Sequence, residues 1–136
     1  MSKERRQSSR HRLDLPLRFR IYLPSRPDPG PPTFHTGRLY DISRHGISLL
    51  TNTVEHNGLH IFRPDVLAFE QCLLEIELPR EGEPLLIKGR VVWYDKAPPG
   101  SPFAFRAGVA FLDLSTDLRK QVKTFLHQAG SSSNDS

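Results

Sequence analysis

The chain has 136 residues, of which 37% are hydrophobic and 25% are charged, and these values are typical of one globular domain with its own core. The sequence has no apolar run near the roughly 20 residues that a membrane-spanning helix requires. Residues 1–12 are too polar for a signal peptide, so we predict a cytoplasmic protein. A single cysteine excludes an intramolecular disulfide and a cysteine-based zinc site.

The net charge of +4 is concentrated near the N-terminus. Residues 1–20 contain seven Lys or Arg and two Asp or Glu, a balance of +5, so residues 21–136 sum to −1. A local cluster of cations suggests an anionic partner that meets this part of the chain. The alternative reading of the same cluster is a solubilising tail.

The first predicted element is a strand over residues 15–23. In LPLRFRIYL, every second residue from Leu15 to Leu23 is apolar, which is typical of a strand with one face on a core and one in water. Five prolines in residues 24–32 then predict a loop, because proline cannot donate backbone hydrogen bonds. Two more strands are predicted around a tight turn, FHTGRLYDI and GISLLTN.

Residues 53–71 are the least regular segment and could contain a short helix or a long loop. Beyond them, β-branched and aromatic residues predict three further strands, CLLEIELP, LLIKGRVVWYD and FAFRAGVAFLD, separated by the turns REGEP and KAPPGSP. No helical pattern interrupts these strands before Ser115. We therefore predict an all-β-dominated fold, a small six-stranded antiparallel β-barrel or sandwich.

A C-terminal amphipathic α-helix is predicted to begin at Ser115 or Thr116, either of which can act as its N-cap. Apolar residues then recur at helical spacing, so one face of the helix should pack on the barrel. Gly130 is a candidate stop, and the polar residues after it are predicted to be disordered. The predicted segments are a flexible basic arm (1–12), the barrel with its helix (13–129) and a disordered tail (130–136).

Two groups of polar residues stand out from this pattern. The arm contains RRQSSR, in which Arg6 and Arg10 are four residues apart and Arg5 directly precedes them. The turn between the second and third strands is DISRHG, which is richer in functional side chains than a simple hairpin needs. The residues of interest in this turn are Asp41, Ser43 and Gly46.

These two motifs resemble the signatures of the PilZ domain, RxxxR ahead of the first strand and [D/N]xSxxG after it. The resemblance extends to the order of the elements and to VVWYD and GVAF, and it spans residues 5–128. It implies a split β-barrel that is a bacterial receptor of cyclic di-GMP, a second messenger, and not an enzyme. The ligand-binding residues that it implies are Arg5, Arg6, Arg10, Asp41, Ser43 and Gly46.

The chemistry of cyclic di-GMP, with two phosphodiesters and two guanines, agrees with these residue types. A guanidinium can bind phosphate oxygens or guanine O6 and N7 in a bidentate manner, and it can stack on a purine. The carboxylate of Asp41 can accept from the N1–H and the exocyclic amine of guanine, a pair that adenine does not offer. Ser43 can donate or accept beside it, and Gly46 lets the backbone approach closely or adopt a positive φ.

Three further residues are secondary candidates. Arg44 occupies an unspecified position of the second motif. Trp93 is expected to pack the barrel or to line the ligand face, and Gly108 to relieve crowding or mark a bulge. Within the family, an arginine directly before RxxxR is associated with two intercalated cyclic di-GMP molecules, so Arg5 implies two ligands per chain.

Two alternative functions remain open at this point. A small basic barrel could bind single-stranded nucleic acid, although aromatics are not interleaved with the arginines and Asp41 would repel a phosphate backbone. A degenerate PilZ domain could bind only proteins. We predict no cofactor, no metal site, and no nucleic-acid or membrane partner, but a downstream protein partner and a monomer or weak homodimer. His56 and His60 have the spacing of a helical metal pair, but Asn57 and Gly58 between them argue against a helix.

Overall fold

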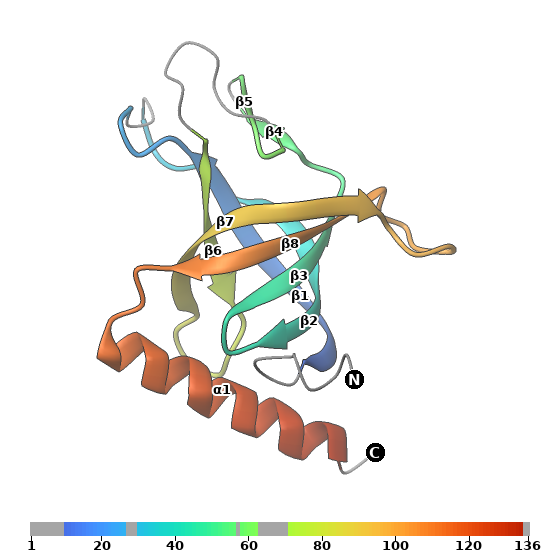
Figure 1. Ribbon diagram of the computed structural model, residues 1–136, viewed down its shortest axis with the longest axis vertical. Coiled ribbons are helices and arrows are strands. Elements are labelled where there is room, and N and C mark those ends of the chain that lie inside the picture. Colours follow the sequence, from blue (N-terminus) through green and yellow to red (C-terminus); the bar gives the residue numbers. More distant parts are fainter. Residues whose placement is uncertain (1–9, 27–29, 57, 63–70, 135–136) are drawn as a thin grey trace, which may run out of the picture.

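The computed structural model describes residues 10–26, 30–56, 58–62 and 71–134, with a closed six-stranded antiparallel barrel and one C-terminal helix, as predicted (Figure 1). The order around the barrel is β1-β2-β3-β8-β7-β6, and β1 pairs with β6 to close it. Strand β8 therefore joins β3, which lies far from it in the sequence. The barrel strands are β1 (His11–Tyr22), β2 (His35–Ser43), β3 (Gly46–Thr51), β6 (Leu73–Leu78), β7 (Leu85–Lys96) and β8 (Phe105–Leu112).

The core forms because alternate residues of each strand point into the barrel. On β1 the inward residues Leu17, Phe19 and Ile21 are buried, while Arg18 between them is exposed. Complete burial of one such side chain contributes roughly 1.5–3 kcal/mol. Similar alternation on β6 and β7 fills the same interior with leucine, isoleucine and valine side chains.

Helix α1 (Thr116–Asn134) lies across one end of the barrel (Figure 1) and buries Val122 and Phe125 against it. The Oγ of Ser115 accepts a hydrogen bond from the Leu118 N–H at 3.1 Å, as an N-cap should. The predicted stop at Gly130 is wrong, because the helix continues through this residue to Asn134. The predicted tail is accordingly wrong for residues 130–134. Glycine lowers helix stability by only about 1 kcal/mol relative to alanine, so it need not end a helix.

The described part of the irregular segment 53–71 contains a small hairpin, which was not predicted from the sequence. Its strands are β4 (Glu55–His56) and β5 (Leu59–His60), joined at Gly58, whose φ of +83° suits glycine. Residues 63–70 lie outside the described residues. In the part of the chain that the structure describes, no group of three or more potential metal ligands occurs.

The first barrel strand begins earlier than the sequence pattern predicts. Strand β1 begins at His11, inside the predicted arm, and its Arg12 is the register partner of Asp41. Three irregularities in register, in β1, β2 and β7, change which side chains point outward. No helix within the described ranges is long and apolar enough to cross a membrane.

Candidate ligand-binding face

The polar turn and the start of β1 meet on one outer face of the barrel. Cross-strand register connects Arg12 to Asp41, Asp41 to Ser48, Ser48 to Gly108, and Gly108 to Trp93. This row crosses five strands, β1, β2, β3, β8 and β7, and brings distant parts of the sequence together. We call the row and its neighbours the Asp41 face, which consists of Arg10, Arg12, Tyr40, Asp41, Ser48, Trp93, Arg106 and Gly108.

A bulge in β2 turns two consecutive side chains toward this face. Leu39 and Ile42 are both fully buried in the core, although strict alternation would place them on opposite sides of the strand. The register shift between Leu39 and Asp41 supplies the extra residue that allows this. Tyr40 and Asp41 therefore both lie on the outer side, where Asp41 is only 7% exposed because arginines cover it.

Asp41 is held by two arginines from different parts of the chain. Nε and Nη2 of Arg10 donate to its Oδ1 at 3.2 and 3.0 Å, and Nη2 of Arg106 donates to its Oδ2 at 3.4 Å. Hydrogen bonds between charged groups are stronger than neutral ones, and here the carboxylate is also shielded from water. The arrangement fixes the Asp41 side chain while each oxygen keeps further capacity to accept.

Aromatic rings separate the guanidinium groups of this face. The guanidinium carbons of Arg12 and Arg106 lie 3.9 and 4.2 Å from the ring centroid of Tyr40, and that of Arg106 lies 5.3 Å from the ring centroid of Trp93. Distances within about 6 Å allow cation–π attraction. The three arginines, Arg10, Arg12 and Arg106, outnumber the carboxylates of Asp41 and of Asp95, the register partner of Arg106, which makes the face a cationic surface with flat rings.

Ser43 and Gly46 support the turn beside Asp41. The Oγ of Ser43 is buried and accepts a hydrogen bond from the His45 N–H at 3.2 Å. Gly46 pairs with Ser43 across the turn and with Ala110 on β8. A Cβ at Gly46 would collide with the backbone oxygen of Val109, and Gly46 is not among the described glycines with positive φ. Of the two roles predicted for Gly46, the structure therefore shows close backbone approach.

Trp93 lies over Gly108 on the outer surface and outside the core. A Cβ at Gly108 would collide with the Trp93 indole, so glycine allows the ring to lie against β8. The side chain remains 42% exposed. The register irregularity is on β7, between Val91 and Trp93, opposite Gly108. The clash that a larger residue would make with Trp93 explains the glycine at position 108. The bulge that was considered for this strand occurs on its partner strand, β7.

Two polar atoms on this face are buried without a hydrogen-bond partner among the described residues. They are Oγ of Ser48 and Nε of Arg106. Buried polar groups are normally paired, and each exception requires an explanation. Both atoms belong to the Asp41 face, which agrees with a surface whose polar groups form hydrogen bonds with a bound ligand.

The structure brings together part of the predicted site. Arg10, Asp41, Ser43, Gly46, Trp93 and Gly108 lie on or beside the Asp41 face, whereas Arg5 and Arg6 lie outside the described residues. Arg44 is on the turn and exposed.

Tyr40, Ser48 and Arg106 of the Asp41 face were not predicted as site residues from the sequence. For Arg106, a signal was available, because it is two residues before Gly108 and alternation puts both on one side of β8. Tyr40 was harder to predict, because the bulge in β2 is what places both Tyr40 and Asp41 on the outer side.

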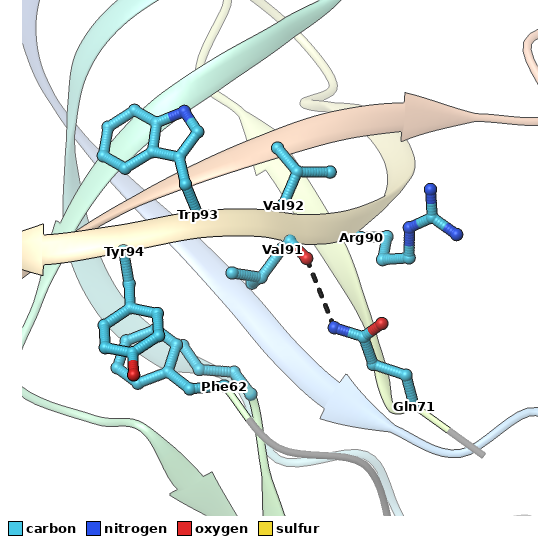
Figure 2. A pocket seen from close by; sticks show the side chains of 8 residues that line it. Phe62, Gln71, Arg90, Val91, Val92, Trp93 and Tyr94 are labelled. Carbon is cyan, nitrogen blue, oxygen red and sulfur yellow. Dashed lines mark hydrogen bonds between the residues drawn. The ribbon is translucent and has the colours of Figure 1, made fainter. Parts of the chain in front are cut away.

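A pocket of about 580 Å³ borders the Asp41 face along the edge of β7. Figure 2 shows Trp93 and Val92 on one side of β7 and Tyr94 on the other, where Tyr94 stacks on Phe62 with centroids 4.0 Å apart. Nε2 of Gln71 donates to the backbone oxygen of Val91 at 3.2 Å. Among the pocket residues, only Trp93 also belongs to the Asp41 face, so the pocket is a neighbouring feature.

These features define a small β-barrel with a cationic binding face on its outer wall. The sequence model of the PilZ domain matches residues 4–128, and the chain belongs to the PilZ domain family. The comparison with curated proteins gives no significant match.

Solved PilZ structures share the fold. The PilZ domain of YcgR from Escherichia coli, solved with c-di-GMP, is 15% identical with a TM-score of 0.66, over 96% of this chain and 95% of that one. YcgR from Escherichia coli in complex with c-di-GMP is 14% identical with a TM-score of 0.59, over 96% of this chain and 48% of that one. The Bacillus subtilis inhibitor of motility MotI/DgrA is 17% identical with a TM-score of 0.58, over 94% and 52%. The chain thus spans about half the length of the last two proteins.

Proposed function

We propose that this chain is a cytoplasmic receptor of cyclic di-GMP that binds the dinucleotide on the Asp41 face. The observation that carries the proposal is the carboxylate of Asp41 at the centre of three arginines and two aromatic rings. The surplus of positive charge on this face suits a ligand with two phosphodiester charges. Membership of the PilZ family and the similar fold of YcgR, solved with c-di-GMP, support the same ligand.

The guanine edge is the group that Asp41 suits. Its two carboxylate oxygens can accept from N1–H and the 2-amino group together, so a guanine fits and an adenine does not. Trp93 offers an exposed ring on which a base can stack, a contact worth about 1–3 kcal/mol per base. Ser43 and Gly46 contribute by shaping the turn that holds Asp41.

The arm supplies the remaining contacts. Arg10 already connects the arm to the barrel through its ion pair with Asp41. Ordering about six arm residues would cost on the order of 6–12 kcal/mol, since each residue costs roughly 1–2 kcal/mol. A hydrogen bond to a charged group returns about 1.5–3 kcal/mol, so Arg5, Arg6 and Arg10 must all contribute, together with stacking. We infer that the arm folds over the ligand and that Arg5 allows two intercalated molecules per chain.

Closure of the arm would change the surface that the barrel offers to a partner protein. In this mechanism cyclic di-GMP shifts the arm between two states, and the partner distinguishes them. The chain would act by binding and not by catalysis, as a monomer or weak homodimer. No described residue indicates which cellular process the receptor controls.

The decisive test is calorimetric titration of the intact chain with cyclic di-GMP. We expect saturable binding that falls by at least about tenfold in Arg6→Ala and in Asp41→Ala, since each loses charged hydrogen bonds. Arg119→Ala, on the exposed side of α1, is the matched control for the loss of an arginine. Cyclic di-GMP should also protect the arm from protease, whereas single-stranded RNA at moderate salt should not. Failure of the intact chain to bind cyclic di-GMP would refute the proposal, and protection by RNA would favour a nucleic-acid-binding barrel.

A further inference from the structure

Arg106 lies outside both sequence motifs but contacts the acidic group and both rings of the Asp41 face. Its Nη2 donates to Oδ2 of Asp41 at 3.4 Å, and its guanidinium carbon lies 4.2 Å from the Tyr40 centroid and 5.3 Å from that of Trp93. The side chain is 29% exposed, so a ligand can reach it. Its Nε is buried and has no partner within the described part of the chain.

The backbone of Arg106 is fixed on both sides by the barrel. It pairs with Leu50 on β3 and with Asp95 on β7. Arg10, by contrast, precedes β1 and reaches the barrel from the arm. A cation whose backbone is already ordered loses little conformational entropy when it binds a ligand.

Arg106 is also less committed to Asp41 than Arg10 is. Arg10 makes two hydrogen bonds to Oδ1, at 3.2 and 3.0 Å, and Arg106 makes one at the longer distance of 3.4 Å. The attraction of Asp41 is therefore directed mainly to Arg10. The guanidinium of Arg106 keeps donors available, and it contacts Asp41 on one side and the ring of Trp93 on the other.

We propose that Arg106 is a phosphate-binding cation that the folded barrel itself supplies to cyclic di-GMP. The inference rests on the proposed function and adds a binding residue to it. In the proposed complex one guanine edge binds Asp41 and a base stacks on Trp93. The phosphodiester that joins the two nucleotides then passes Arg106, which contacts both Asp41 and Trp93. Tyr40 holds the guanidinium in place by stacking.

The fixed position of Arg106 predicts a specific effect on the binding kinetics. A fixed surface cation attracts the anionic ligand during encounter, so its loss lowers the association rate and weakens the dependence of that rate on salt. A residue that only supported the barrel would not change the association rate and its salt dependence together.

The test is stopped-flow binding of a fluorescent cyclic di-GMP derivative to full-length variants. In Arg106→Met we expect the association rate to fall about threefold to tenfold and its salt dependence to flatten. Arg106→Lys should recover most of the association rate because the charge is kept. Arg90→Met, which removes an exposed arginine from β7, is the matched control and should change the rate less than twofold.

The outcomes distinguish this inference from the proposed function. If the unmodified chain binds cyclic di-GMP and Arg106→Met associates at the unmodified rate, the inference is wrong and the receptor function stands. If Arg106→Met and Arg90→Met slow association equally, the effect comes from the net charge of the chain, and the inference is also wrong. If the unmodified chain does not bind cyclic di-GMP, both proposals fail. Equal thermal unfolding midpoints for Arg106→Met and the unmodified chain would exclude loss of folding as the cause.

Discussion

Arg10 donates to Asp41 from two nitrogens at once, with Nε and Nη2 at 3.2 and 3.0 Å from the same oxygen, Oδ1. A guanidinium and the N1–H and 2-amino edge of guanine present a similar pair of donors. Arg10 therefore uses accepting capacity of Oδ1 that a guanine edge would share in the proposed complex. If the guanine displaced Arg10 from this oxygen, the phosphates of the same ligand would provide the acceptors to which Arg10 could move.

The role of Asp41 can be tested by Asp41→Leu, which keeps a side chain of similar size but removes both acceptor oxygens. We expect the Kd for cyclic di-GMP to rise by at least about tenfold, because a charged hydrogen bond contributes about 1.5–3 kcal/mol. Calorimetry measures the change. Asp14→Leu is the control, since Asp14 pairs with Arg38 and its side chain is 81% exposed. Unchanged affinity in Asp41→Leu would remove the guanine-recognition role.

Stoichiometry is the property that Arg5 should determine. We expect the unmodified chain to bind two molecules of cyclic di-GMP and Arg5→Ala to bind one, since the second ligand loses a guanidinium contact. Titration at chain concentrations well above Kd reads the number of sites directly. Lys3→Ala removes an equal charge from the same segment and should still bind two. One ligand per unmodified chain would contradict the prediction.

Trp93 is the only tryptophan, so its fluorescence reports on the Asp41 face. Stacking of a base on the indole should change its emission when cyclic di-GMP binds. Trp93→Leu should weaken binding by about fivefold to 150-fold, since stacking contributes about 1–3 kcal/mol per base. Tyr94→Leu is the matched control, because Tyr94 is also exposed but lies on the other side of β7 against Phe62 (Figure 2). Equal effects of the two variants would argue against stacking on Trp93.

The fold was predictable from the sequence because the strands that form the barrel alternate clearly. Outward polar residues on β6 and β7, such as Glu75 and Lys88, alternate with buried aliphatic residues, so the pattern identifies both strands and their inner faces. The ends were less predictable. The helix continues through Gly130 because a glycine stops a helix only if its backbone leaves the helical conformation, which composition does not determine.

The Asp41 face was predictable only in part, because its assembly depends on pairing between distant strands. The motifs identified Arg10 and Asp41, and the structure joins them. Arg106 was missed although it stands two residues before Gly108, because it reaches Asp41 only through the pairing of β8 with β3, two strands far apart in the sequence. Tyr40 was missed because the bulge in β2 reverses the expected alternation.

Two glycines of the site should respond differently to the same substitution. In Gly46→Ala the new methyl group meets the backbone oxygen of Val109, which paired strands hold in place. Overpacking of this kind costs about 1–3 kcal/mol. In Gly108→Ala the methyl group meets the exposed Trp93 side chain, which can move aside. We expect chemical denaturation to show a larger loss of stability for Gly46→Ala, and a larger change in Trp93 fluorescence for Gly108→Ala. The reverse order would contradict this assignment.

His35, at the start of β2, should make the stability of the barrel depend on pH. Burial, followed by the charge of the neighbouring His56, lowers the pKa of His35 from its ordinary value of 6.5. Its ring lies 5.1 Å from that of His56 and 5.8 Å from that of Phe19, and its Nε2 is buried without a partner among the described residues. The folded chain therefore disfavours the charged imidazole.

The sign of the effect follows from proton uptake by His35. Below pH 6.5 the unfolded chain protonates this residue while the folded chain does not, so the free energy of unfolding falls as the pH decreases toward the lowered pKa. Above pH 6.5 both states are neutral and the contribution is fully present. Urea unfolding between pH 7.5 and 5 should show this decrease, and His35→Gln should flatten it because the amide does not titrate in this range. His127→Gln, on the exposed side of α1, should leave the slope as it is in the unmodified chain. A slope that survives in His35→Gln would assign the pH dependence to other groups.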